Sequence, residues 1–204
     1  MRMIKQPDDE PSLQETAYHE AGHAVACYFL HKRFKEVSIK PGAQKLGRLN
    51  YPEKMRKSIP SERELASVRR EYVVSLAGIV SEGIFSGKDG FEDILPFLNL
   101  PSNATKDTQK LNYTFWKMVF IETKLLLYSP RTWQAVITLA DELLIQETMR
   151  YQAAREVIRQ AIEDYDAGVR DDVSARHHLC YSEFVKEIAD SKIRFREWIN
   201  DIYH

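Results

Sequence analysis

The chain has 204 residues, of which 44 % are hydrophobic, enough for one domain with a proper core and no disulfide framework. Lys and Arg number 29 against 30 Asp and Glu, so the net charge of −1 gives no electrostatic reason to expect a nucleic acid or an anionic membrane as a partner. The two cysteines are typical of a reducing compartment. Because the sequence shows neither a signal peptide nor an apolar run of roughly 20 residues, we expect a cytoplasmic protein.

The first predicted helix follows a polar lead. Residues 1–11 contain two prolines and are expected to be flexible. Ser12 and Glu15 then form a capping-box pattern, which predicts a helix that runs to about Lys32. Its apolar residues recur at spacings of three and four and form one stripe. The stripe comprises Leu13, Ala17, Ala21, Ala24, Val25 and Tyr28, and leaves His19, Glu20, His23 and Cys27 outside it.

A small β region is predicted after this helix. Residues 36–40 alternate and are rich in β-prone side chains, and Pro41-Gly42 marks a turn. Residues 46–51 are suited to a second short strand, so we expect a small sheet or hairpin at about 36–51. Ser61 and Glu64 then form a second capping-box pattern, which predicts a helix that runs to about Ser86 and stops at Gly87.

The rest of the chain is predicted to be helical after an irregular stretch at 88–103. We expect helices at about 104–127, from Pro130 to about Arg150, at about 152–166, and at 182–199. The adjacent His177 and His178 are predicted to lie in a loop. The expected fold is therefore mostly α, with residues 12–166 as the main domain and 167–204 as a C-terminal helical extension.

His19-Glu20-Ala21-Gly22-His23 matches the pattern H-E-x-x-H. Residues four apart lie on the same face of a helix, so both imidazoles can reach one metal ion. Zinc lowers the pKa of a bound water to roughly 7, and a neighbouring carboxylate such as Glu20 can take its proton. Gly22 is unfavourable inside a helix, which predicts a close neighbour at that position. The alternative is a polar helix face that carries two histidines by chance.

A catalytic zinc ion uses three protein ligands, and the third one is not determined by spacing. Cys27 and His31 continue the four-residue spacing, but Cys27 is roughly 12 Å from His19 along a helix axis. We therefore interpret Cys27 as a packed side chain and His31 as a solvated one. The acidic candidates are Glu82, Asp89, Glu92, Asp93 and Asp107.

Several segments resemble the peptidase domain of the FtsH family of ATP-dependent zinc proteases. The resemblance begins at Thr16-Ala17-Tyr18-His19-Glu20-Ala21-Gly22-His23-Ala24 and continues at Val37 to Gly42 and at Leu46-Gly47. Further similar segments are Leu76-Ala77-Gly78 through Gly87, the stretch from Ala104 to Val119, and Leu139 to Met149. It covers about residues 12–162.

The resemblance implies a helical domain with a small sheet, a zinc ion held by His19, His23 and Asp107, and Glu20 as the base. Glu82 is the rival third ligand, or a hydrogen-bond partner of a histidine. Two features depart from the family pattern: the loop before Asp107 is longer, and Ile79 stands where the family has an arginine.

These observations predict a zinc-dependent endopeptidase that acts on polypeptides. The sequence shows neither the family's AAA ATPase domain nor its membrane segment. We therefore expect peptides or unstructured segments as substrates, or a separate ATPase partner, and a monomer or small homo-oligomer. The strand at 37–40 is either purely structural or an edge on which an extended substrate pairs. The alternative function is a catalytically inactive zinc-binding interaction domain.

Overall fold

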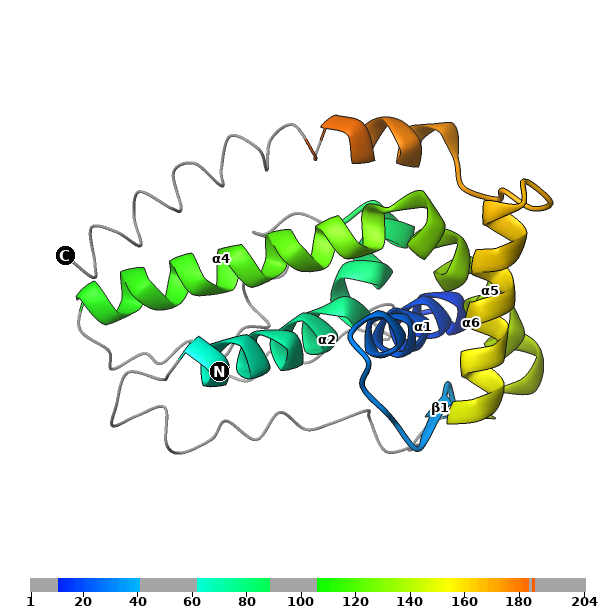
Figure 1. The fold of residues 1–204 in the computed structure, drawn as a ribbon, viewed down its shortest axis with the longest axis horizontal. Helices are drawn as coiled ribbons and strands as arrows, with labels where there is room; N and C mark the ends of the chain where they lie inside the picture. Colours follow the sequence, from blue (N-terminus) through cyan, green and yellow to red (C-terminus); the bar gives the residue numbers. More distant parts are fainter. Residues whose placement is uncertain (1–10, 41–61, 89–105, 184, 186–204) are drawn as a thin grey trace, which may run out of the picture.

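The computed structural model describes residues 11–40, 62–88, 106–183 and 185, and it confirms a mostly helical fold with a small antiparallel sheet (Figure 1). Helix α1 spans Leu13–Phe29 and begins at the predicted capping box. The Glu15 amide donates to Ser12 Oγ at 3.1 Å, and the Ser12 amide donates to Glu15 Oε2 at 2.7 Å. The helix ends three residues earlier than expected, because His31 adopts a left-handed φ of 55°.

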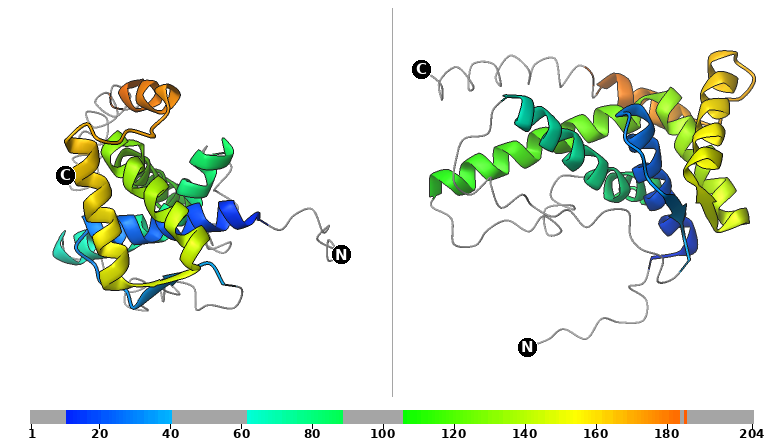
Figure 2. Two further views of the ribbon diagram at one scale, coloured as in Figure 1. Left: turned by 90° about the vertical axis from the view of Figure 1, so that its right-hand side faces the viewer. Right: turned by 60° about the horizontal axis from the view of Figure 1, so that its bottom comes forward.

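Four other helices pack around α1. They are α2 (Glu62–Ser86), α4 (Lys106–Tyr128), α5 (Pro130–Gln146) and α6 (Tyr151–Asp166). Pro130 occupies the first turn of α5 as predicted, after Ser129 at the N-cap position. The right-hand view of Figure 2 shows α1 crossing the C-terminal half of α2. This crossing brings the H-E-x-x-H segment of α1 against α2.

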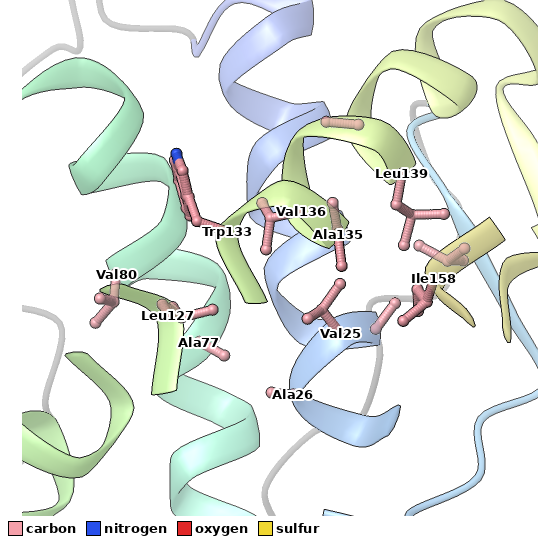
Figure 3. Close-up of a cluster of buried hydrophobic side chains, with 14 of the residues drawn as sticks. Val25, Ala26, Ala77, Val80, Leu127, Trp133, Ala135, Val136, Leu139 and Ile158 are labelled. Atoms are coloured by element: carbon pink, nitrogen blue, oxygen red, sulfur yellow. The ribbon is translucent and has the colours of Figure 1, made fainter. Parts of the chain in front are cut away.

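The core lies between α1, α2, α5 and α6. Figure 3 shows Val25 of α1 close to Ala135 and Val136 of α5, and Leu139 beside Ile158 of α6. All five of these side chains are buried. The predicted stripe of α1 is too narrow, since every residue from Ala21 to Cys27 is buried, whereas Leu13 is 58 % exposed. Neighbours on several sides explain this difference, because sequence periodicity describes a helix with only one covered face.

The sheet consists of β1 (Glu36–Ser38) and β2 (Thr148–Arg150), paired antiparallel with Val37 opposite Met149. The predicted partner at 46–51 lies outside the described residues. The prediction that the helix from Pro130 extends to Arg150 is wrong, because α5 ends at Gln146 and Glu147 adopts a left-handed φ of 57°. Burial of Val37 and Met149 against the core favours the strand over another helical turn.

The chain beyond α6 is attached to α5 and α4. Gln134, fully buried in α5, donates to the Asp172 carboxylate at 3.0 Å and accepts from the Asp172 amide at 2.7 Å. A further helix covers 175–183, so the prediction of a loop at His177 and His178 is wrong. The predicted helix at 182–199 lies mostly outside the described residues. None of the helices that the structure describes is both long and apolar enough to cross a bilayer.

Candidate metal centre

The two motif histidines face α2 at a point where the helix backbones approach closely. A Cβ atom added at Gly22 would lie 2.4 Å from the Ala77 carbonyl oxygen and 2.5 Å from Ser81 Cβ. Contacts below 3.0 Å are essentially never seen for real Cβ atoms, so only glycine fits at position 22 without a shift of α2. This confirms the expectation that Gly22 has a close neighbour, and that neighbour is the α2 backbone.

Both imidazoles use Nδ1 to bind α2. His19 Nδ1 lies 2.8 Å from Glu82 Oε2, and His23 Nδ1 lies 2.6 Å from the Val74 carbonyl oxygen. A carbonyl oxygen only accepts hydrogen bonds, so the His23 proton lies on Nδ1, and an ionised Glu82 requires the same of His19. In neutral rings with this tautomer, each Nε2 carries a lone pair.

The two Nε2 atoms face each other at a distance of 3.2 Å. Two lone pairs at this distance repel unless one nitrogen carries a proton that it donates to the other, or both bind one metal ion. Zinc–nitrogen bonds of about 2.0–2.1 Å in a tetrahedral arrangement place two ligand nitrogens about 3.3–3.4 Å apart. Nδ1 bonded to a carboxylate or a carbonyl is also the usual support of a zinc-bound histidine. The ring positions therefore fit a zinc ion held by His19 and His23.

Of the other predicted site residues, some lie near the two histidines and others do not. Glu20 is half-buried on α1, between the two histidines in sequence. Glu82 is brought to the pair, at His19 Nδ1. Asp107 belongs to the first turn of α4, and Figure 1 shows that this end of α4 points away from α1, so the structure does not bring that turn to the histidines. The Asp107 side chain and the acids Asp89, Glu92 and Asp93 lie outside the described part of the chain.

No group of three metal-ligating side chains occurs among the residues that the structure describes. Cys27, four residues after His23, is buried as predicted, and burial raises the pKa of its thiol to about 11. His31 is exposed, also as predicted. Within the described part of the chain, the candidate site therefore consists of the two histidines, Glu20 and the acceptors on α2.

An aromatic stack adjoins the histidine pair. Tyr18 stacks on Phe85 of α2 with ring centroids 4.1 Å apart, and it also contacts Trp133 of α5 at 5.7 Å. Burial raises the pKa of the Tyr18 phenol, so this ring stays neutral at ordinary pH. Phe85 is 40 % exposed, so the surface of α2 near Glu82 presents an aromatic ring to solvent.

Two parts of this site cannot be inferred from the H-E-x-x-H pattern. The Val74 carbonyl is a backbone atom, and any residue type would supply it. Gly78 lies against both imidazoles: a Cβ atom there would lie 2.3 Å from His23 Nε2 and 2.7 Å from His19 Nε2. The sequence contained one relevant signal, a glycine in the interior of a predicted helix, which is unfavourable without a packing reason.

A search of protein-family models gives no match to the chain. Among curated proteins, the chain is similar to the mitochondrial inner membrane m-AAA protease component yta12 of Schizosaccharomyces pombe, with 36 % identity over 100 residues. The match covers 47 % of this chain, and the chain spans only 11 % of the relative's length. This distant and partial homology to an FtsH-family protease suggests a protease-related function.

Proposed function

We propose that this chain is a zinc-dependent endopeptidase that hydrolyses unstructured polypeptides, with His19 and His23 as zinc ligands and Glu20 as the general base. The observation that carries the proposal is the pair of Nε2 atoms 3.2 Å apart, each on a ring whose Nδ1 is bonded to α2. A proton on one nitrogen or a metal ion bound to both would satisfy this contact, and its spacing suits zinc. The homology to a protease component supports the hydrolytic chemistry.

For the third ligand we propose Asp107, from the family resemblance, with Glu82 as the rival. The hydrogen bond between His19 Nδ1 and Glu82 indicates that Glu82 orients the ring and does not itself bind the metal, because it holds the ring from the side opposite Nε2. Asp107 ligates only in an arrangement in which the first turn of α4 lies closer to α1 than in Figure 1. The two acids therefore require a direct test.

A zinc ion at this site would polarise the scissile carbonyl and acidify a water molecule. Glu20 accepts the proton of the attacking water and delivers it to the leaving amine. Glu82 and the Val74 carbonyl hold the two rings in the tautomer that directs both Nε2 lone pairs inward. His23 is only 9 % exposed, which limits competition by bulk water on its side of the site.

For the substrate we propose an extended polypeptide that pairs with β1 along the edge opposite β2. Among the described residues β1 pairs only with β2, and backbone pairing would hold a peptide without selecting its sequence. Unfolded segments fit such an edge directly. For folded substrates we propose an ATPase supplied by a separate chain.

The decisive experiment compares the wild type with Glu20→Gln for bound zinc and for cleavage of casein. Loss of the base should lower the cleavage rate about 10²–10⁴-fold while zinc stays bound. Glu15→Gln is the matched control, since it makes the same change on α1 in the capping box, where glutamine also fits. Zinc in both proteins with cleavage by neither would favour the inactive interaction domain, and a wild type without zinc would overturn the proposal.

The third ligand is tested by measuring zinc per chain in Asp107→Ala and Glu82→Ala. We expect Asp107→Ala to lose stoichiometric zinc, because a three-ligand site becomes a two-ligand site. Glu82→Ala should keep zinc at saturation with an affinity lowered about 10–100-fold, as for other partners of metal-bound histidines. The opposite result would make Glu82 the ligand.

A further inference from the structure

Helix α2 faces the histidine pair with three positions spaced four residues apart. The carbonyl of Val74 accepts from His23 Nδ1, and the carboxylate of Glu82 bonds His19 Nδ1. Gly78 lies midway between these two positions on the same helix face. The two hydrogen-bond acceptors and the glycine between them therefore share a single face of α2 over two turns.

Any side chain at position 78 would collide with the ring nitrogens of the two histidines. The three nearest atoms to an added Cβ are His23 Nε2 at 2.3 Å, His19 Nε2 at 2.7 Å and His23 Cε1 at 2.7 Å. These are not ends of flexible side chains, because each ring is fixed by its Nδ1 bond to α2. An alanine at position 78 must therefore displace the rings or separate the helices.

The same missing side chain exposes the acceptor of His23. In an α-helix each Cβ is tilted toward the N-terminus, so it leans over the turn that precedes it. For position 78 that turn contains the carbonyl of Val74, which also lies four residues earlier in the helical hydrogen-bond pattern. A glycine here leaves room for an imidazole to reach a carbonyl that is normally covered in a helix interior.

The second glycine at this crossing makes a different kind of contact. A Cβ at Gly22 would meet Ala77 and Ser81 of α2, and neither imidazole is among its nearest atoms. Gly22 therefore permits close packing of α1 on α2, whereas Gly78 makes room for the histidine rings. The two roles can be separated by experiment.

We propose that Gly78 is a positioning residue of the metal centre: its lack of a Cβ lets both imidazoles lie on the α2 backbone with Nδ1 bonded and Nε2 directed at one ion. This inference rests on the proposed zinc function. It assigns to α2 a steric part in the site, in addition to its two hydrogen-bond acceptors.

The first test titrates the full chain with Co²⁺, a spectroscopic substitute for zinc, and follows its visible absorption and affinity. Wild type must bind, and failure there would contradict the proposed function rather than the role of Gly78. We expect Gly78→Ala to bind about 10–100-fold more weakly, with an altered absorption band, as for lost partners of metal-bound histidines. The added Cβ of Gly22→Ala meets α2 and not the rings, so this variant should weaken binding less than Gly78→Ala does. Wild-type affinity and spectrum in Gly78→Ala would overturn the inference.

The second test needs no metal. The unfolding equilibrium of the metal-free chain is measured for Gly78→Ala alone and in a His19→Ala/His23→Ala background. If the added Cβ collides with the rings, Gly78→Ala should raise the unfolding equilibrium constant more in the wild-type background than in the double-alanine background. The two factors should differ at least tenfold, as for other side chains in contact. The loss caused by Gly22→Ala should stay the same in both backgrounds.

An equal loss at position 78 in both backgrounds would mean that Gly78 serves helix packing alone, and would overturn the inference. If Gly78→Ala does not fold by itself, the test is whether it folds in the His19→Ala/His23→Ala background. A folded triple variant supports the inference, and an unfolded one contradicts it.

Discussion

His23 and His177 are both nearly buried, with 9 % and 5 % of their surfaces exposed, yet their rings are engaged in opposite ways. His23 uses Nδ1 to reach α2 and directs Nε2 at a second histidine. His177 bonds the Tyr128 carbonyl through Nε2 at 2.8 Å, and its ring stacks on those of Tyr128 and Trp133 with centroid distances of 4.8 and 5.2 Å.

Burial therefore does not distinguish a candidate metal ligand from a packed histidine. The distinction lies in which ring nitrogen is bonded to the protein, and in what the other nitrogen faces. At the α1–α2 crossing, the Nε2 atoms of two histidines converge. At His177, Nε2 donates to a carbonyl and the imidazole stacks on two aromatic rings, so the ring joins the C-terminal helix to α4 and α5.

The largest expected effect concerns metal binding. His23→Ala should abolish stoichiometric zinc binding, because one of two converging ligands is lost. His31→Ala, an exposed histidine just beyond α1, is the matched control and should bind zinc as the wild type does. Zinc per chain, measured after dialysis, distinguishes the two outcomes. Retention of zinc by His23→Ala would contradict the proposal that His23, unlike His177, binds zinc.

His177→Ala should leave zinc binding intact and destabilise the fold. It removes two stacked ring contacts and one hydrogen bond, which together stabilise by roughly 2–4 kcal/mol. The neighbouring His178→Ala is the control, since this side chain is 39 % exposed and pairs only distantly with Asp171 at 3.5 Å. Denaturant unfolding should show that the control lowers the free energy of unfolding by less than about 0.5 kcal/mol. Equal losses for both variants would contradict the assigned role of His177.

Gln134→Ala should destabilise the chain by about 1–2 kcal/mol at pH 7, because Asp172 loses its buried partner. The hydrogen bond from Gln134, followed by that from Arg170, lowers the pKa of Asp172 below 3.8. A lowered folded-state pKa stabilises above the unfolded value, and this contribution disappears as the pH falls through the folded value. The stability difference between wild type and Gln134→Ala should therefore shrink below about pH 3.8.

The control for this measurement is Gln160→Ala, whose exposed side chain bonds Asp164 one turn along the same helix. It should stay within about 0.5 kcal/mol of the wild type at each pH. A constant stability difference for Gln134→Ala between pH 7 and pH 3 would show that Gln134 does not stabilise the ionised form of Asp172.

The smallest effect is expected at Cys27, one turn after His23. With a pKa of about 11, only about one thiol in a thousand is ionised at pH 8, and its sulfur is buried. Cys27 should therefore react with an alkylating reagent at least about 100-fold more slowly than the partly exposed Cys180. Mass spectrometry of labelled peptides measures both rates. Comparable rates would indicate that α1 opens readily near the histidine pair.

Much of the helical fold is predictable from local signals. The capping box at Ser12, the proline after Ser129 and the glycine at 87 each mark a helix end that the structure confirms. Local signals predict a helix at 148–150, whereas the β conformation found there depends on pairing with residues at least 110 positions earlier. Local signals also predict a loop at His177, because its packing partners Tyr128 and Trp133 are distant in sequence.

The sequence alone determined that His19 and His23 share one face of a helix with Glu20 beside them, because helical geometry relates residues four apart whatever surrounds them. The tertiary structure decided which ring nitrogens converge. That outcome depends on the Val74 carbonyl, the Glu82 carboxylate and the missing side chain of Gly78, all on a second helix about 50–60 residues away. No local pattern in α1 records these contacts, because they exist only where the two helices cross.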